Sequence, residues 1–173
     1  NTGGQASKST QTGAIAKFAA SGKEGVKKNL SLMAMAYGDV YVAQVSLGAN
    51  PMKTIQAFKE AESYNGVSLI VAYSPCIEHG IKGGLSNHNT VQKKAVASGY
   101  WPIFRYDPRL EEAGESPLTI DMQEPDYGLF RDFVMGETRY NQLPRVNPDN
   151  AEFLLNKSEE EAKKRLARIK KFA

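Results

Sequence analysis

The stretch VSLIVAYSPC, residues 67–76, decides the fold class of this chain. Residues 67–73 form a near-continuous apolar run, which is typical of a strand buried on both faces of a parallel sheet. Pro75 restricts the backbone of Ser74 and turns the chain out of the strand. Cys76 is therefore presented beyond the carboxyl end of the strand, where open α/β sheets bind their ligands.

The segments on either side of this strand alternate between helix and strand. Composition and hydrophobic spacing predict helices at residues 13–20, 30–37, about 51–64 and about 89–97, and strands at residues 40–45 and 102–106. This order implies right-handed crossovers between parallel strands. We therefore expect an α/β fold with an open, mostly parallel sheet flanked by helices.

The helix after residue 50 carries the clearest start signal. Asn50 is predicted to cap it, with Pro51 at its first position. Ile55, Phe58 and Ala61 then recur at helical spacing, so we expect them to face the core.

The composition changes after Asp107, where prolines and glycines interrupt any long element. We predict a short strand within residues 118–122 and a helix over 127–140 that is broken at Gly136. The sequence SEEE at residues 158–161 is a capping box that would open a terminal helix. We expect residues 1–108 to form one partial domain, and residues 109–173 to form an irregular helical C-terminal extension that packs on it.

Composition indicates a globular chain with a real core. The 173 residues are 41% apolar and 24% charged, as in ordinary soluble domains. The net charge of +3 gives no support for nucleic-acid binding. No apolar run approaches the roughly 20 residues of a membrane helix, and no secretory signal is seen. The single cysteine excludes an internal disulfide and fits a reducing compartment.

The opening loop NTGGQASKST, residues 1–10, is the first candidate for chemistry. Its glycines allow close backbone approach to a ligand, and its Ser, Thr and Lys side chains could contact phosphate. It is not a P-loop, because Ser7 rather than a glycine precedes Lys8. Such a loop is more often a simple connection. Since a domain seldom starts inside a loop, we expect Asn1 to follow a break in a longer polypeptide.

Cys76 is the second candidate, and four interpretations of it compete. It could be a small buried thiol acting as a hydrophobe, or a nucleophile activated by His79. It could ligate zinc with His79 and His88, although structural zinc sites usually need four ligands. It could also ligate an iron–sulfur cluster, which typically takes four thiolates and would need cysteines from outside this sequence. Spacing alone does not choose between them.

Several segments together resemble one enzyme family. They are NTGGQASKST at residues 1–10, AYSPCI at 72–77, GYWP at 99–102 and RYDP at 105–108. The combination resembles the pyruvate:ferredoxin (flavodoxin) oxidoreductases, in the C-terminal part of their thiamine-diphosphate-binding module. The similarity is most specific from residue 1 to about 108 and more diffuse beyond.

The resemblance implies cofactors and residue roles. The family oxidatively decarboxylates pyruvate with coenzyme A to acetyl-CoA and CO2, using thiamine diphosphate, Mg2+ and 4Fe-4S clusters. Asn1 matches the asparagine beside the thiamine cofactor, whose amide can stabilise developing oxygen charge. Cys76 matches a cysteine that ligates the cluster nearest thiamine. The other cluster ligands, the magnesium ligands and the Gly-Asp-Gly segment of the thiamine motif precede Asn1 in the family, so we expect the isolated chain to be inactive.

The resemblance also implies partners. These are pyruvate, coenzyme A, ferredoxin or flavodoxin, the remainder of the same polypeptide, and a second copy in a homodimeric parent enzyme. It implies a cytoplasmic location, or a hydrogenosome-like organelle in a eukaryote. Two alternatives stay open: an NADP-linked fusion variant of the enzyme, and a non-catalytic half-domain that serves as a binding or assembly module through an exposed sheet edge.

Overall fold

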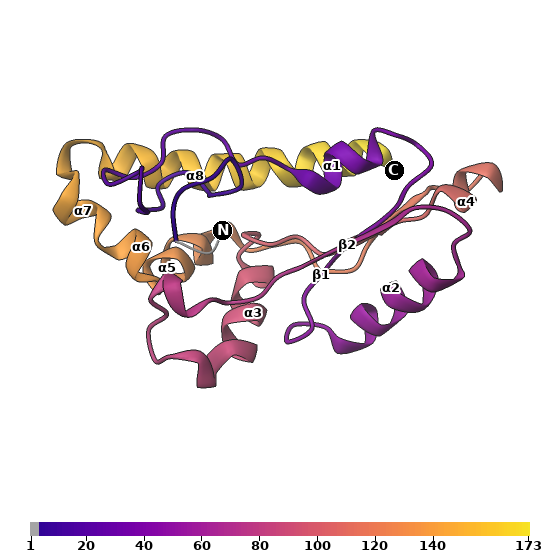
Figure 1. Cartoon of the computed structure of the whole chain (residues 1–173), viewed down its shortest axis with the longest axis horizontal. Helices are drawn as coiled ribbons and strands as arrows, with labels where there is room; N and C mark the ends of the chain where they lie inside the picture. Colours follow the sequence, from indigo (N-terminus) through magenta and orange to yellow (C-terminus); the bar gives the residue numbers. More distant parts are fainter. Residues whose placement is uncertain (1–3) are drawn as a thin grey trace.

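The computed structural model describes residues 4–173 and has an α/β architecture, as predicted (Figure 1). Within these residues a mixed sheet has the strand order β2-β1-β3-β4. Its strands are β1 (Tyr41–Val45), β2 (Ser68–Ala72), β3 (Phe104–Tyr106) and β4 (Leu118–Ile120).

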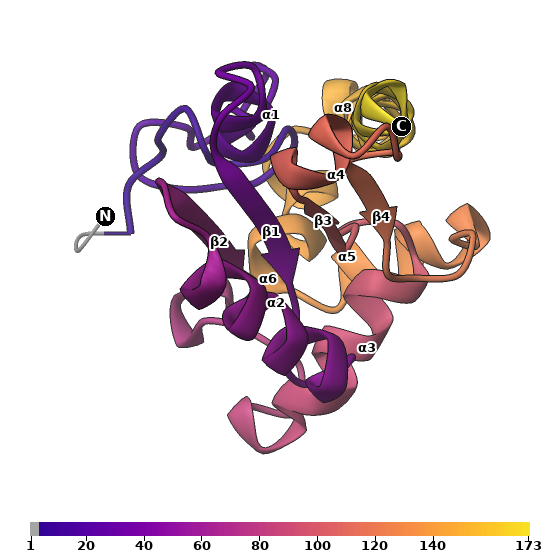
Figure 2. The same cartoon turned by 90° about the vertical axis from the view of Figure 1, so that its right-hand side faces the viewer.

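Helices cover both faces of this sheet. They are α1 (Leu30–Met35), α2 (Pro51–Ser63), α3 (His88–Ala97), α4 (Pro108–Glu112), α5 (Phe130–Met135), α6 (Thr138–Asn141), α7 (Leu143–Val146) and α8 (Pro148–Ile169). Figures 1 and 2 show α1 and α8 on one side of the sheet and α2 on the other. Met35 of α1 and Ile169 of α8 pack with Val42, whereas Ala57 of α2 packs with Ala43. Each face of the sheet therefore has its own core cluster, and a third and larger cluster gathers residues of α3, α5, α6, α7 and α8.

The expectation of a mostly parallel sheet is wrong. Only β1 and β2 pair in parallel, while β3 runs antiparallel to β1 and β4 runs antiparallel to β3. The reason lies in the connection through α3, which sits beyond the carboxyl end of β1. There Ser46 Oγ donates to Gln92 Oε1 at 2.9 Å, and Trp101 Nε1 donates to the Val45 carbonyl at 3.0 Å. The chain re-enters the sheet from that end, so β3 runs back along β1.

The burial expected for β2 is also wrong. The strand lies at the edge of the sheet with β1 as its neighbour, and its residues range from half-buried to exposed. The apolar run predicted the strand correctly, but this strand is not buried on both faces.

Helix α2 begins as the sequence predicts but turns a different face inward. Asn50 caps it, because the Asn50 Oδ1 atom accepts a hydrogen bond from the Lys53 amide. Ile55 and Phe58 are 48% and 56% exposed, so the expectation that they face the core is wrong, whereas Ala61 packs partly buried against the core as expected. The small residue Ala57 faces β1 instead, which lets the helix lie close to the sheet.

Residues 13–20 do not form the predicted helix. They form tight turns, in which Ala16 and Ala19 make an isolated bridge and Phe18 has a φ of 65°. The Ile15 amide donates to the Arg139 carbonyl at 2.8 Å. This docking on α6 replaces the local hydrogen bonds that a helix would make.

The terminal helix begins ten residues before the predicted capping box. Helix α8 starts at Pro148, with Asn147 before it, and Ser158 is buried in its middle. The predicted inward stripe is confirmed, since Ala162, Leu166 and Ile169 are all buried. Among residues 4–173, no helix is both apolar enough and long enough to cross a bilayer.

Candidate functional site

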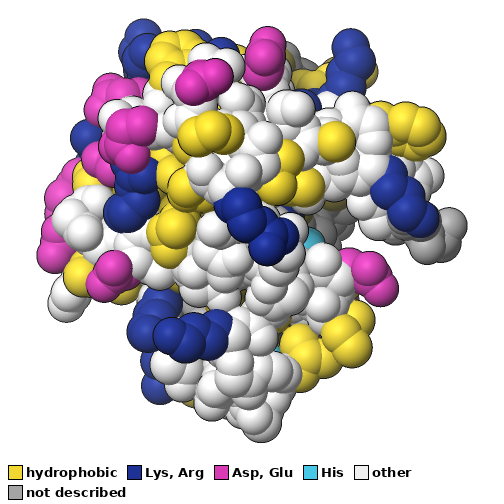
Figure 3. Space-filling model, turned by 90° about the vertical axis from the view of Figure 1, so that its left-hand side faces the viewer, with side chains coloured by type: hydrophobic (Ala, Val, Ile, Leu, Met, Phe, Trp, Pro, Cys, Tyr) yellow, Lys and Arg dark blue, Asp and Glu magenta, His cyan; other side chains and the backbone are white. Residues whose placement is uncertain are grey.

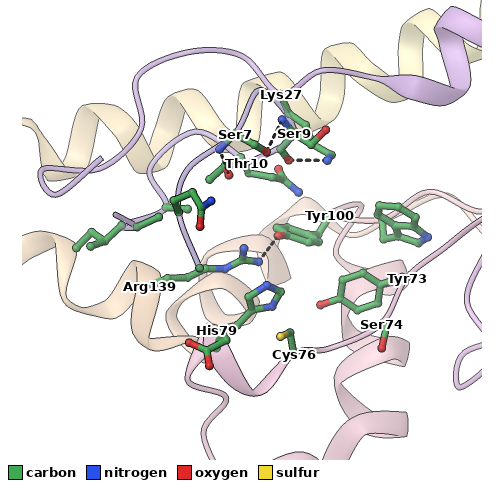
Figure 4. A pocket seen from close by; sticks show the side chains of 18 of the residues that line it. Ser7, Ser9, Thr10, Lys27, Tyr73, Ser74, Cys76, His79, Tyr100 and Arg139 are labelled. Atoms are coloured by element: carbon green, nitrogen blue, oxygen red, sulfur yellow. Dashed lines mark hydrogen bonds between the residues drawn. The ribbon is translucent and has the colours of Figure 1, made fainter. Parts of the chain in front are cut away.

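A pocket of about 410 Å3 opens where the N-terminal loop, the segment after β2 and helix α6 meet (Figure 4). One wall comes from residues 4–16 together with Lys27, and the other from residues 72–79, Tyr100, Trp101 and Arg139. In the space-filling view a histidine lies in a hollow, with a Lys or Arg side chain and an acidic side chain near it (Figure 3). The pocket therefore joins the two sequence segments that carry the candidate chemistry.

Cys76 lines this pocket just beyond the carboxyl end of β2, as the Ser74-Pro75 turn predicts. It is a free, half-buried cysteine in extended backbone, immediately before the short 3-10 helix η1 (Ile77–His79). Its side chain is therefore not part of the packed core, which argues against a purely hydrophobic role.

The loop that carries Cys76 is fixed to α6 through one glycine. The Gly80 carbonyl accepts hydrogen bonds from the amide and the hydroxyl of Thr138, both at 2.9 Å. Gly80 has a φ of 65°, and a side chain there would collide with Thr138. The position of Cys76 therefore depends on a close backbone approach that only glycine permits.

The structure bears on the two alternatives for Cys76 that involve histidine, which are a nucleophile activated by His79 and a zinc site with His79 and His88. The Nδ1 atom of His79 is buried without a hydrogen bond among the described residues. Burial, and then the charge of Arg139, lower the His79 pKa to about 4. Residues 4–173 contain no group of three His, Cys, Asp or Glu side chains able to hold a metal. The zinc site with His79 and His88 is therefore not formed, and His88 lies exposed at the start of α3.

A buried ionic cluster forms the wall beside Cys76. The Arg139 Nε atom donates to Glu137 Oε2 at 2.6 Å, and its Nη2 atom donates to the Tyr100 hydroxyl at 2.8 Å. The Tyr100 and Tyr140 hydroxyls lie 3.3 Å apart. The sequence placed Tyr100 within the GYWP segment that carries the resemblance, and it gave no role to Glu137 or Arg139. The one signal was two opposite charges placed directly after the break at Gly136.

Two polar groups of this cluster are left without partners. Glu137 is 1% exposed, and its Oε1 atom makes no hydrogen bond among the described residues. Burial raises the Glu137 pKa, although Arg139 opposes the shift. The Tyr73 hydroxyl also makes no hydrogen bond of normal length there, although it lies close enough to Glu137 for the two groups to shift each other's pKa; burial, with Tyr100 and Glu137, raises the Tyr73 pKa. Because unpaired buried polar groups are costly, they indicate a site that a ligand completes.

Lys27 brings a second cation to the pocket from the opposite wall. Its Nζ atom donates to the Ser9 carbonyl at 2.7 Å. Burial, and then the nearby charges of Arg165, Lys23 and Arg139, together lower the Lys27 pKa to about 8. Two cations therefore line the cavity, together with the carboxylate of Glu78.

Comparison with known proteins shows which enzymes the chain is similar to. No family model matches the chain. The chain is 53% identical over all 173 residues to the pyruvate:ferredoxin oxidoreductase of Moorella thermoacetica. It is homologous to a segment of the pyruvate:ferredoxin and pyruvate-flavodoxin oxidoreductases. The pyruvate-flavodoxin oxidoreductase of Klebsiella pneumoniae is 48% identical over the same length. The chain spans only 14% and 15% of these two relatives.

A third relative is the mitochondrial pyruvate dehydrogenase (NADP(+)) of Euglena gracilis. It is 49% identical over 154 residues, which are 89% of this chain and 8% of that protein. The family resemblance read from the sequence segments is therefore confirmed, and it covers a small part of each oxidoreductase.

The pocket residues fit one corner of an iron–sulfur cluster, the group that the sequence resemblance implies. A thiol faces a cavity that carries two cations, which suits an anionic cluster, and three further thiolates would have to come from other sequence. Asn1, the predicted thiamine contact, lies outside the described residues. The roles of Asn1 and Cys76 stay predictions.

Proposed function

We propose that this chain is part of a pyruvate:ferredoxin or pyruvate-flavodoxin oxidoreductase. That enzyme oxidatively decarboxylates pyruvate with coenzyme A to acetyl-CoA and CO2, and passes the electrons through 4Fe-4S clusters to ferredoxin or flavodoxin. Identity of 48–53% over the whole chain to enzymes of these names supports the proposal. Because the chain is a small part of those enzymes, it acts within a longer polypeptide and is inactive by itself.

Within this enzyme the chain's contribution is one wall of the site. Thiamine diphosphate, held with Mg2+ by residues upstream of Asn1, supplies the carbanion chemistry when bound. The amide of Asn1 would donate a hydrogen bond to oxygen charge that develops on the substrate. Cys76 would supply one thiolate to a 4Fe-4S cluster. The observation that carries this assignment is the half-buried thiol facing a cavity shared with the N-terminal loop.

The electron acceptor has a second candidate. The Euglena gracilis relative carries NADP(+) in its name and is 49% identical over most of this chain. Reduction of NADP+ rather than of flavodoxin or ferredoxin by the full-length polypeptide would establish the NADP-linked variant.

The direct test compares Cys76→Ala with the unchanged full-length polypeptide. We expect the variant to lose the iron and the visible absorption of one 4Fe-4S cluster, together with pyruvate oxidation. Ser74→Ala, which alters a neighbouring pocket residue without removing a thiol, is the matched control and should keep every cluster. Retention of all clusters in Cys76→Ala would remove the role assigned to this thiol. Pyruvate oxidation by the isolated 173 residues would contradict the proposed dependence on a longer chain.

A non-catalytic binding module is the competing class of function, since β2 leaves a sheet edge open to pairing. If the chain is such a module, a longer polypeptide that contains it should bind no iron. Iron analysis of that polypeptide therefore separates the two classes.

A further inference from the structure

Arg139 presents a fixed cation to the pocket. Its side chain is 15% exposed and is held by Glu137 through Nε and by Tyr100 through Nη2. Its guanidinium also lies 5.0 Å from the centre of the Tyr140 ring. The Nη1 atom makes no hydrogen bond with any residue in the range 4–173. One donor edge of a buried, immobilised cation is therefore left for a ligand.

Tyr73 presents a hydrogen-bond donor to the same pocket. It is 9% exposed, and its ring packs 6.1 Å from Tyr100 and 5.4 Å from Trp101, measured between ring centres. Its hydroxyl points toward the interior of the pocket, on the side where Cys76 lies (Figure 4). The ring packing fixes it beside Glu137, so in the folded chain its hydrogen-bond partner is either Glu137 or a ligand of the pocket.

We propose that Arg139 and Tyr73 raise the reduction potential of the cluster that takes Cys76 as a ligand. The inference rests on the proposed function, because it requires that cluster. When the cluster accepts one electron, its net charge becomes more negative by one unit. A nearby cation stabilises the reduced form more than the oxidised form, and little solvent screens it inside a pocket. A hydroxyl that donates to a cluster sulfur acts in the same direction.

Under this proposal the role of Arg139 and Tyr73 differs from that of a cluster ligand. Neither is a cluster ligand, so their removal should leave the iron in place and change its electronic properties. A merely structural role would affect folding or cluster retention and would leave the midpoint potential of the retained cluster unchanged.

The test is a redox titration of the full-length polypeptide with its clusters, followed by electron paramagnetic resonance, with iron content measured alongside. The variants are Tyr73→Phe, which removes only the hydroxyl, and Arg139→Gln, which removes the charge and keeps a polar group beside Glu137. Tyr37→Phe and Arg145→Gln make the same chemical changes at exposed positions outside the pocket and serve as matched controls.

We expect a lower midpoint potential for one cluster in both variants, with the larger shift in Arg139→Gln, full iron content, and no shift in the controls. Unchanged potentials in Tyr73→Phe and Arg139→Gln at full iron content would overturn the inference and leave the proposed function standing. If Arg139→Gln loses iron, Tyr73→Phe decides alone: a lowered potential supports the inference and an unchanged one overturns it. Retention of every cluster in Cys76→Ala would instead remove the proposed role of Cys76 as a cluster ligand, and the inference with it.

Discussion

Two buried arginines, Arg105 in β3 and Arg139 in α6, show how similar ion pairs can serve different ends. Their side chains are 10% and 15% exposed. Arg105 meets two carboxylates: it donates to Asp121 through Nε at 2.6 Å and Nη2 at 3.1 Å, and to Glu60 through Nη1. Among residues 4–173, Glu137 is the only carboxylate that pairs with Arg139.

The carboxylates beside the two arginines differ accordingly. Burial alone would raise the pKa of Glu60, but hydrogen bonds from Arg105, Tyr41 and Gln56 outweigh it and the pKa is lowered. Burial dominates at Glu137, whose pKa is raised. The Arg105 cluster therefore ties α2 to the sheet and is complete, while the Arg139 cluster is incomplete and faces a cavity. Burial does not distinguish the two clusters. The structural cluster around Arg105 has a complete set of hydrogen bonds, and the candidate-site cluster around Arg139 does not.

The largest expected effect tests the complete cluster. Arg105→Met would leave the carboxylates of Asp121 and Glu60 without their cation and should lower the free energy of unfolding by about 3–5 kcal/mol. Urea denaturation of the chain measures this loss. Lys53→Met is the control, because Lys53 pairs with Asp121 at 3.4 Å from a side chain that is 40% exposed. It should cost less than about 1 kcal/mol. An equally small loss in Arg105→Met would remove the structural role of this cluster.

The same substitution at the incomplete cluster should cost less. Arg139→Met leaves one buried carboxylate, Glu137, which can take up a proton instead of staying charged. We expect a loss of about 1–3 kcal/mol at pH 7. Because the Glu137 pKa is raised, the loss should shrink when urea denaturation is repeated at pH 5. If the loss equals that of Arg105→Met and does not change with pH, the proposed difference between the two clusters is contradicted.

The pH dependence of the unfolding free energy tests Lys27, the second cation of the candidate site. Its pKa is about 8 in the folded chain and 10.5 in the unfolded chain. Between these values the unfolded state binds more protons, so stability should rise with pH. From pH 8 to 9.5 this group should contribute an increase of about 1.5 kcal/mol.

The measurement is the difference in unfolding free energy between the unchanged chain and Lys27→Met at each pH, which removes the effect of other titrating groups. The increase should be absent in the variant. Parallel pH curves for the two proteins would show that the charge of Lys27 is not disfavoured by the pocket.

The smallest effect is expected at Cys76. It is half-buried and faces the cavity rather than the core, so Cys76→Ala should change the unfolding free energy of the isolated chain by less than about 1 kcal/mol. Thermal or urea denaturation measures this. A loss of about 2 kcal/mol or more would restore the interpretation of Cys76 as a packed hydrophobic thiol.

Local signals account for what the sequence predicted well. Asn50 and Pro51 predicted the start of α2, and the structure confirms it. The same pair stands at the start of α8, with Asn147 just before the helix and Pro148 as its first residue, ten residues before the capping box that was expected to start it. The position of Cys76 after β2 follows from Pro75, its immediate neighbour in the sequence. Caps and proline turns act over one to four residues, so they can be recognised from the sequence alone.

The sequence by itself determined the alternation of helices and strands, the turn that exposes Cys76, and the segments by which the family is recognised. Only the tertiary structure decided the direction of β3, the inward face of α2 and the partners of the two arginines. Glu60 and Arg105 are 45 positions apart, and Tyr100 and Arg139 are 39 apart. Such contacts depend on how distant elements pack, and no local rule of charge or periodicity specifies which pairs will meet.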